Sequence, residues 1–250
     1  MRAMKSLKYL VPNGFTATSM LFGLASVVCS SSGRFELAAW MILWGVLLDK
    51  LDGSAARLLN ASSDFGVQFD SFADFVIFGI APAALFFFRL RQPDLYPDGT
   101  GYILTLITLG VYVVATSSRL ARFNISEPPG GDQFFFGIPT TLVGAAVASG
   151  YLTVVHYGYE MVVLPYAPYI LFICAVSMVS NVRLPKLKSR KNKFVHWFQI
   201  INLVIVYLIT PFQLFPEYLF VLMLGYLCIG LTWALFNPID TSETPTESVA

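Results

Sequence analysis

Eight apolar stretches, most of them about 20 residues long, divide almost the whole of this sequence. An α-helix of this length, with a rise of about 1.5 Å per residue, spans the roughly 30 Å hydrocarbon core of a bilayer. Inside that core the backbone must satisfy its own hydrogen bonds, so continuous apolar runs favour helices over irregular structure. The sequence therefore predicts eight transmembrane helices near 12–30, 36–59, 65–88, 101–122, 137–157, 161–181, 197–213 and 215–236.

The overall composition supports this interpretation. Hydrophobic residues make up 56% of the chain and charged residues 12%, whereas soluble domains have about 45–50% and about 25%. The apolar runs are continuous rather than alternating, which argues against a transmembrane β-barrel. We therefore expect an all-α, polytopic membrane protein that contacts the lipid bilayer and has no nucleic-acid partner. The three cysteines lie far apart, so neither a disulfide framework nor a zinc site is expected.

Proline and glycine mark the joints between the predicted helices, and the chain has no linker long enough to separate two domains. Residues 1–238 are therefore predicted to form a single membrane domain. The polar, acidic residues 239–250 are predicted to be a disordered tail. The first apolar run begins near Val11 without a small-residue cleavage site, so we expect it to be retained as a membrane span.

Lysine and arginine predict how the helices are oriented. With the N-terminus in the cytoplasm, 13 of the 16 basic residues fall on the cytoplasmic side and 3, Arg34, Arg89 and Arg91, on the outer side. Positive charge accumulates on the cytoplasmic side of membrane proteins. We therefore expect a protein of the cell (inner) membrane with both termini in the cytoplasm. The basic cluster at 186–193 is interpreted as a topology anchor, with contact to anionic lipid headgroups as the alternative.

Four aspartates at the junction of the second and third predicted helices stand out in so apolar a chain. Asp49 and Asp52 are three residues apart and Asp70 and Asp74 are four apart, so each pair lies on one face of its helix. A short turn makes the helices antiparallel, which lets the pairs converge. Carboxylates this close repel one another unless a cation lies between them. Oxygen ligands suit Mg²⁺ or Mn²⁺. Four carboxylates fit two such ions, which typically serve displacement at phosphorus.

Small and basic residues are interleaved with these aspartates. Gly53 and Ala56 leave the face of the first pair open to a ligand, and Gly66 does the same on the next helix. Arg57 adds a fixed charge and a planar fork suited to phosphate. Asp64 follows the loop sequence "NASS" and is expected to be the N-cap of the third helix rather than a site residue. Solvated loop charges are the simple alternative, but carboxylates within membrane segments usually signal function.

The complete pattern reads Asp49-x2-Asp52-Gly53-x2-Ala56-Arg57-x8-Gly66-x3-Asp70-x3-Asp74. It resembles the signature of the CDP-alcohol phosphotransferase family without departure at any fixed position. The resemblance implies that an alcohol attacks a CDP-linked lipid, that CMP leaves, and that the protein is a homodimer. It also implies two divalent cations held by the four aspartates, with Asp74 as the base for the incoming hydroxyl. The CDP pocket would then be lined by Gly53, Ala56, Arg57 and Gly66.

Other stretches resemble one branch of this family, the CDP-diacylglycerol–serine O-phosphatidyltransferases. The stretch "VPNGFTATSMLFG" at 11–23 is similar to the first helix of the family, which implies that Asn13 and Thr16 face the nucleotide. The stretches "SRLARFNI" at 118–125 and "FFGIPTT" at 135–141 are similar to sequences of that branch. The resemblance implies that CDP-diacylglycerol and L-serine are converted into phosphatidylserine and CMP at a site facing the cytoplasm.

The residues that would bind serine are less sharply defined. Arg119 and Arg122 are three apart on one helix face and form a candidate clamp for a carboxylate or a phosphate. An anchoring stripe at the helix end is the alternative. Asn124 is a candidate polar partner for the amino acid, and Lys186 and Lys188 are candidates for holding phosphate oxygens.

Two other functions stay open. The same chemistry could use glycerol 3-phosphate, inositol phosphate or choline as the acceptor. A cation-coupled membrane transporter could also carry ions on these carboxylates, although that function leaves the glycine, alanine and arginine spacing unexplained.

Overall fold

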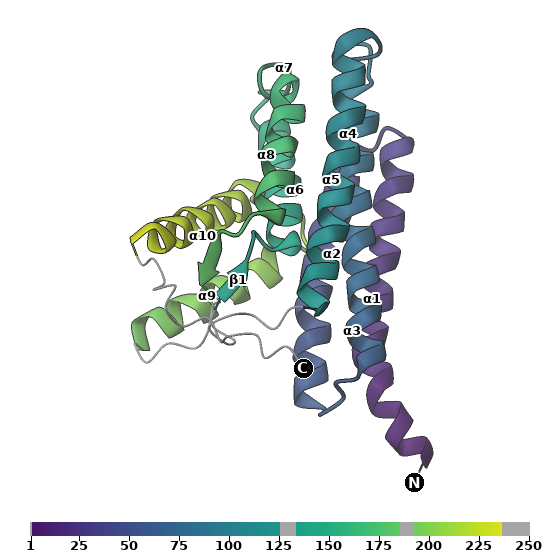
Figure 1. The fold of residues 1–250 in the computed structure, drawn as a ribbon, viewed down its shortest axis with the longest axis vertical. Helices are drawn as coiled ribbons and strands as arrows, with labels where there is room; N and C mark the ends of the chain where they lie inside the picture. The colour runs from purple at the N-terminus through teal and green to yellow at the C-terminus, as the bar shows by residue number, and fades with distance from the viewer. Residues whose placement is uncertain (1, 126–133, 186–192, 237–250) are drawn as a thin grey trace, which may run out of the picture.

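The computed structural model describes residues 2–125, 134–185 and 193–236, and almost all of them are helical (Figure 1). In chain order the elements are α1 (Arg2–Ser31), α2 (Phe35–Leu58), α3 (Asp64–Asp74), the π-helix η1 (Phe75–Ile80), α4 (Ala81–Leu90), α5 (Gly99–Ile125), β1 (Phe134–Phe136), α6 (Thr140–His156), α7 (Glu160–Val163), the 3₁₀-helix η2 (Leu164–Tyr166), α8 (Ala167–Val179), β2 (Arg183–Pro185), α9 (Lys193–Ile209) and α10 (Pro216–Phe236). Each of the eight predicted stretches contains a helix, which confirms the helical fold class.

Two short strands were not predicted. β1 and β2 pair as an antiparallel ladder in which Phe135 lies opposite Leu184. The adjoining backbone continues the connection, because the Gly137 amide donates to the Val182 carbonyl over 2.8 Å. The predicted helix at 137–157 therefore begins later, at Thr140, after this ladder has turned the chain.

Four helical segments among the described residues are long and apolar enough to cross a membrane: Lys8–Ser31, Asp64–Leu90, Gly99–Ile125 and Glu160–Val179. The segment Asp64–Leu90 joins α3, η1 and α4 into one continuous helix. The helix α2 is of similar length but carries Asp49, Lys50 and Asp52 in its second half. The apolar helices α6, α9 and α10 are shorter, and α9 and α10 run crosswise to the upright bundle (Figure 1). Eight membrane crossings and the side on which each terminus lies therefore stay predictions.

Small and polar residues hold α1 against α2. The hydroxyl of Ser26 donates to the Ala38 carbonyl over 2.8 Å, and that of Ser19 lies 3.3 Å from the Gly45 carbonyl. Such residues allow two helices to approach closely in an apolar environment, where van der Waals packing and interhelical hydrogen bonds drive association. The turn between the helices contains Gly33 with a φ of 75°, a left-handed conformation that glycine adopts without steric cost.

The two ends of the bundle differ in their charges. At the end where α1 stops and α5 starts, Arg89 is buried and forms ion pairs with Asp94 (3.2 Å) and Glu160 (2.8 Å). Its hydrogen bonds hold the pKa of the Asp94 carboxyl below its usual value. The helix ends that meet at the other end of the bundle carry Lys8, Lys50, Arg57, Arg119 and Arg122. This arrangement agrees with the predicted separation of basic residues between two membrane sides.

Candidate active site

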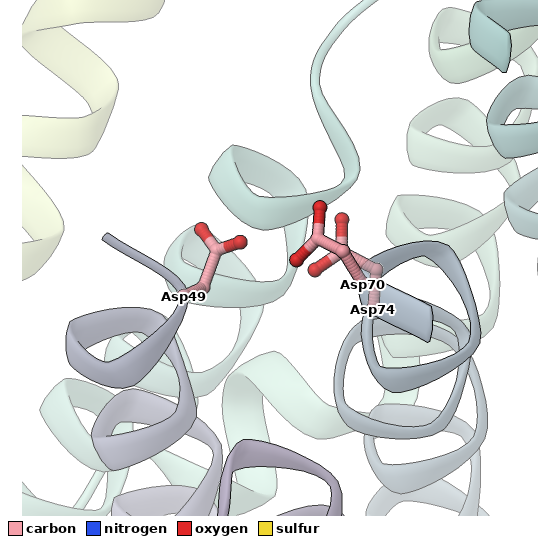
Figure 2. A group of neighbouring side chains, drawn as sticks. All are labelled: Asp49, Asp70 and Asp74. Atoms are coloured by element: carbon pink, nitrogen blue, oxygen red, sulfur yellow. The ribbon is translucent and has the colours of Figure 1, made fainter. Parts of the chain in front are cut away.

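The aspartates of the signature meet between α2 and α3. Asp49 points from the last part of α2 towards Asp70 and Asp74, which project from successive turns of α3 (Figure 2). One carboxylate oxygen from each of these three residues lies within 4.8 Å of the others. The predicted convergence of the two helical faces is therefore confirmed for three of the four aspartates.

The fourth aspartate, Asp52, adjoins this cluster and is tied to α1. It is buried, and its Oδ2 accepts a hydrogen bond of 2.8 Å from the hydroxyl of Thr16. Its carboxylate also lies within side-chain hydrogen-bonding reach of Asp70. Thr16, which the sequence assigned to nucleotide binding, therefore contacts the carboxylate cluster directly.

The cluster concentrates negative charge in a place largely shielded from solvent: Asp52 and Asp74 are buried, and Asp49 and Asp70 are half-buried. Among the described residues two cations lie near it: Lys50 is 3.9 Å from Asp49 but its side chain is 61% exposed, and Arg119 is buried close to Asp74 and Asp49. Two positive charges, one of them in solvent, do not balance four carboxylates. Hard oxygen donors at this separation suit divalent cations such as Mg²⁺ and Mn²⁺. The residues present therefore fit a metal site.

Arg119 is the basic residue most closely associated with the cluster. One guanidinium nitrogen, Nη1, donates to the Thr140 hydroxyl over 3.2 Å, and the group lies over the ring of Phe123. Its Nε is buried without a hydrogen-bond partner among the described residues. A buried donor that lacks a partner is costly. An anionic ligand would supply the missing acceptor.

Arg122 is placed differently from its neighbour one helical turn away. Its guanidinium donates to the carbonyls of Val179 (3.0 Å) and Ser180 (3.1 Å) at the end of α8, a common way to satisfy the last carbonyls of a helix. Gly137 lies against the same place, because a Cβ on it would collide with the carbonyl oxygen of Met178. In this structure Arg122 therefore joins α5 to α8. Of the two arginines of the predicted clamp, Arg122 is bound to backbone carbonyls.

Asn124 links α5 to α3. Its amide donates to the Ser71 hydroxyl over 2.9 Å, one residue from Asp70. Its contacts are with side chains of α3, and the role of Asn124 in serine binding stays a prediction.

The residues predicted to bind the nucleotide lie on α1, α2 and α3, the helices that also carry Thr16 and the four aspartates. The side-chain oxygen of Asn13 lies 3.6 Å from where a Cβ on Gly66 would be. Arg57 is exposed, and its guanidinium lies 3.5 Å from the corresponding position on Gly53. Ala56 is half-buried on the same helix. Lys186 and Lys188 lie outside the described residues.

The N-cap of α3 differs from the prediction. Ser63, not Asp64, precedes the helix in an extended conformation, and its hydroxyl accepts from the Gly66 amide over 3.0 Å. Asp64 is the first helical residue, where its charge suits the positive end of the helix dipole. Both residue types are good N-caps, so the sequence alone did not separate them.

Three residues near the cluster were missed by the sequence interpretation. Thr141 lies near Asp49, and the hydroxyl of Thr140 accepts a hydrogen bond from Arg119. Both belong to the "FFGIPTT" stretch, whose threonines were the available signal. Tyr207 on α9 donates to the Leu47 carbonyl over 3.0 Å, two residues before Asp49, and no motif marked it.

The fold and the site together define a helical membrane protein with a partly buried carboxylate cluster that could bind metal ions. Residues 9–179 match the family model described as CDP-alcohol phosphatidyltransferase. The chain belongs to this family, whose members are generally dependent on divalent cations. Its membership and its apolar helices indicate an integral membrane protein.

Several relatives cover most of the chain. A CDP-diacylglycerol–serine O-phosphatidyltransferase of Helicobacter pylori (strain ATCC 700392 / 26695) is 35% identical over 236 residues, which is 91% of this chain and 92% of the relative. One of Bacillus subtilis (strain 168) is 31% identical and covers 72% of this chain and 92% of the relative. An archaetidylserine synthase of Methanothermobacter thermautotrophicus is 29% identical over 66% of this chain and 64% of the relative.

We expect the hydrogen bond from Thr16 to Asp52 to matter for activity. Replacing Thr16 with valine keeps the side-chain volume but removes the hydroxyl, and loss of a hydrogen bond to a charged group should lower turnover roughly tenfold. The matched control is Thr18→Val, because the Thr18 hydroxyl bonds the Gly14 carbonyl of its own helix. Turnover of both variants should be measured in detergent at saturating substrate. Equal losses in the two variants would contradict the assignment.

Proposed function

We propose that this protein transfers the phosphatidyl group of CDP-diacylglycerol to the hydroxyl of L-serine, giving phosphatidylserine and CMP. The observation that carries the proposal is the meeting of the partly buried Asp49, Asp70 and Asp74 in a chain of the CDP-alcohol phosphatidyltransferase family. The choice of serine is supported by the relatives, of which the one from Helicobacter pylori matches over nearly the full length of both chains.

The aspartates would bind two divalent cations, Mg²⁺ or Mn²⁺. Asp49, Asp70 and Asp74 supply the closely grouped oxygens, and Asp52, held by Thr16, completes the set. When bound, such ions neutralise the pyrophosphate and stabilise the leaving phosphate. Arg57, exposed beside Gly53, would hold a phosphate oxygen of the nucleotide. Asn13, Ala56 and Gly66 would line the same pocket.

Asp74 would act as the general base. The serine hydroxyl forms a bond from its oxygen to the phosphorus that bears the diacylglycerol, while the bond from that phosphorus to the bridging oxygen of the pyrophosphate breaks. The electron pair of the broken bond leaves with CMP, and the serine proton moves to a carboxylate oxygen of Asp74. A base within hydrogen-bonding distance contributes about 10²–10⁴-fold to such a step.

Arg119 would bind the carboxylate of serine. Its buried Nε has no partner in the part of the chain that the structure describes, and the residue lies next to Asp74 and Asp49. A carboxylate would satisfy that donor and orient the hydroxyl towards the base. Arg122 and Asn124 would support this site indirectly by joining α5 to α8 and to α3. The predicted phosphate contacts of Lys186 and Lys188 remain part of the proposal.

The site would face the cytoplasm in the inner membrane, where serine and the nucleotide are available. The basic residues at the helix ends around the cluster support this orientation. The acyl chains of the lipid would remain in the bilayer. A homodimer is proposed on the resemblance to the family alone.

Release of CMP is the direct test. Purified protein in detergent, given CDP-diacylglycerol and Mn²⁺, should release CMP with L-serine far faster than without an acceptor or with glycerol 3-phosphate, inositol phosphate or choline. A chelator should abolish the reaction, and added Mn²⁺ or Mg²⁺ should restore it. Preference for another alcohol would agree with the proposed reaction type but would refute serine as the acceptor. Ion flux into liposomes without CMP release would favour the transporter.

The assignment of Asp74 can be tested by Asp74→Asn. This change keeps the shape of the side chain but removes its ability to accept a proton, so turnover should fall by at least about 10²-fold. The variant should still bind CDP-diacylglycerol, which can be measured by equilibrium dialysis with radiolabelled lipid in micelles. Turnover within a few-fold of the unmodified protein would show that another group is the base.

The assignment of Arg119 can be tested by Arg119→Lys, which retains the charge but loses the planar fork. The apparent KM for serine should rise by about tenfold, the cost of one charge-assisted hydrogen bond, with little change in the KM for the lipid. Arg122→Lys is the matched control and should mainly lower thermal stability. Equal increases in both KM values of Arg119→Lys would refute a serine contact.

A further inference from the structure

A π-helical turn follows the catalytic aspartate directly. The segment η1, Phe75–Ile80, interrupts the helix that begins with α3 and continues as α4. π-helices are rare, make up well under about 1% of residues, and are frequent at functional sites. The position of this one, immediately after Asp74, suggests a reason for its presence.

The π-helical turn changes which residues face the interior. Successive residues of a regular α-helix are about 100° apart, so a row spaced four residues apart rotates by about 40° at each step. Such a row is buried along this whole helix: Asp74, Phe78, Pro82, Phe86 and Leu90. A regular helix would turn the two ends of the row apart by roughly 160°. A π turn contains about one residue more than an α turn. It therefore takes back the rotation of about one residue, and the aspartates and the far end of the helix can both face inward.

Glycines from three neighbouring helices make room for this turn. A Cβ on Gly23 of α1 would lie 2.9 Å from Val76, and one on Gly144 of α6 would lie 2.7 Å from the ring of Phe78. A Cβ on Gly45 of α2 would collide with the side chain of Ile77. Ile77 and Phe78 are fully buried. The neighbouring helices are therefore shaped to receive the π-helical turn, and we call these three residues the glycine socket.

A tyrosine from α5 bonds the same turn. Tyr112 is fully buried, and its hydroxyl donates to the carbonyl of Phe78 over 2.9 Å. Pro82, four residues after Phe78, has no N–H to donate to this carbonyl, and the Tyr112 hydroxyl provides a donor instead. One turn further along the same face of α5, Thr116 packs against Gly79.

We infer that Tyr112 is a positioning residue, which with the glycine socket holds the π-helical turn and so fixes the direction in which Asp70 and Asp74 point. This inference rests on the proposed function, because it assigns to the turn the alignment of the metal-binding carboxylates. Tyr112 lies away from the reacting groups and acts through the backbone of Phe78.

The variant Tyr112→Phe tests the inference, since it removes the hydroxyl alone. Its matched control is Tyr96→Phe, because the Tyr96 hydroxyl donates to the Pro165 carbonyl over 3.0 Å at the opposite end of the bundle. Mn²⁺ binding should be measured by electron paramagnetic resonance on the intact protein in detergent without substrate, together with the melting temperature. We expect Mn²⁺ affinity about three- to tenfold weaker in Tyr112→Phe, as expected for one lost hydrogen bond, and unchanged in Tyr96→Phe.

A second pair of variants tests the turn at Gly79, the residue after Phe78. A Cβ on Gly79 would lie 3.0 Å from the Thr116 methyl group, so Gly79→Ala should weaken Mn²⁺ binding by a similar factor. Adding Thr116→Ser removes that methyl group, keeps the hydroxyl and should restore most of the affinity.

The outcomes separate the two proposals. Unchanged Mn²⁺ affinity in Tyr112→Phe would overturn the inference, and so would a loss in Gly79→Ala that Thr116→Ser does not restore. If Tyr112→Phe does not fold, the result of the Gly79 pair decides. Unmodified protein that binds no Mn²⁺ would refute the proposed metal site itself, which is a different result from a weakened site in the variants.

Discussion

The burial of like charges between α2 and α3 is the constraint on which the rest of this structure depends. Carboxylates taken out of water are stable only with compensating charges or hydrogen bonds. The surrounding helices each provide one partner: Thr16 comes from α1, Arg119 from α5 and Thr141 from α6. The bundle is therefore organised around a polar centre that its own residues satisfy only in part, as a site that binds cations and charged substrates requires.

Packing around that centre relies on the absence of side chains as much as on their presence. Glycines on α1, α2 and α6 allow the helix that carries Asp70 and Asp74 to approach closely. The opposite end is built differently, with Arg89 paired to Asp94 and Glu160. Ion pairs join the helices at one end of the protein, while the other end gathers the carboxylate cluster and the basic residues around it.

The sequence predicted the parts that depend on local spacing. The apolar runs predicted stretches that each contain a helix, and the spacing of the aspartates predicted that Asp49, Asp70 and Asp74 would meet. What it missed depends on contacts between distant segments. The β1–β2 ladder pairs residues about 50 positions apart, and Tyr207 reaches α2 from α9. The sequence also could not show that Arg119 and Arg122 have different roles, because both lie on one helix face. They differ in the structure because Arg122 bonds the carbonyls at the end of α8, whereas Arg119 does not.

The two sides of the site are encoded in different ways. Apart from Lys186 and Lys188, the residues proposed to touch the nucleotide and the metal ions lie on α1, α2 and α3, in one uninterrupted length of chain from Asn13 to Asp74. The side next to Arg119 is assembled from α5, the start of α6 and the end of α8. Mutations could therefore remodel the pocket for the small alcohol while the machinery that activates the lipid is inherited intact. A family built on this plan can diversify its products and still be recognised from a single short motif.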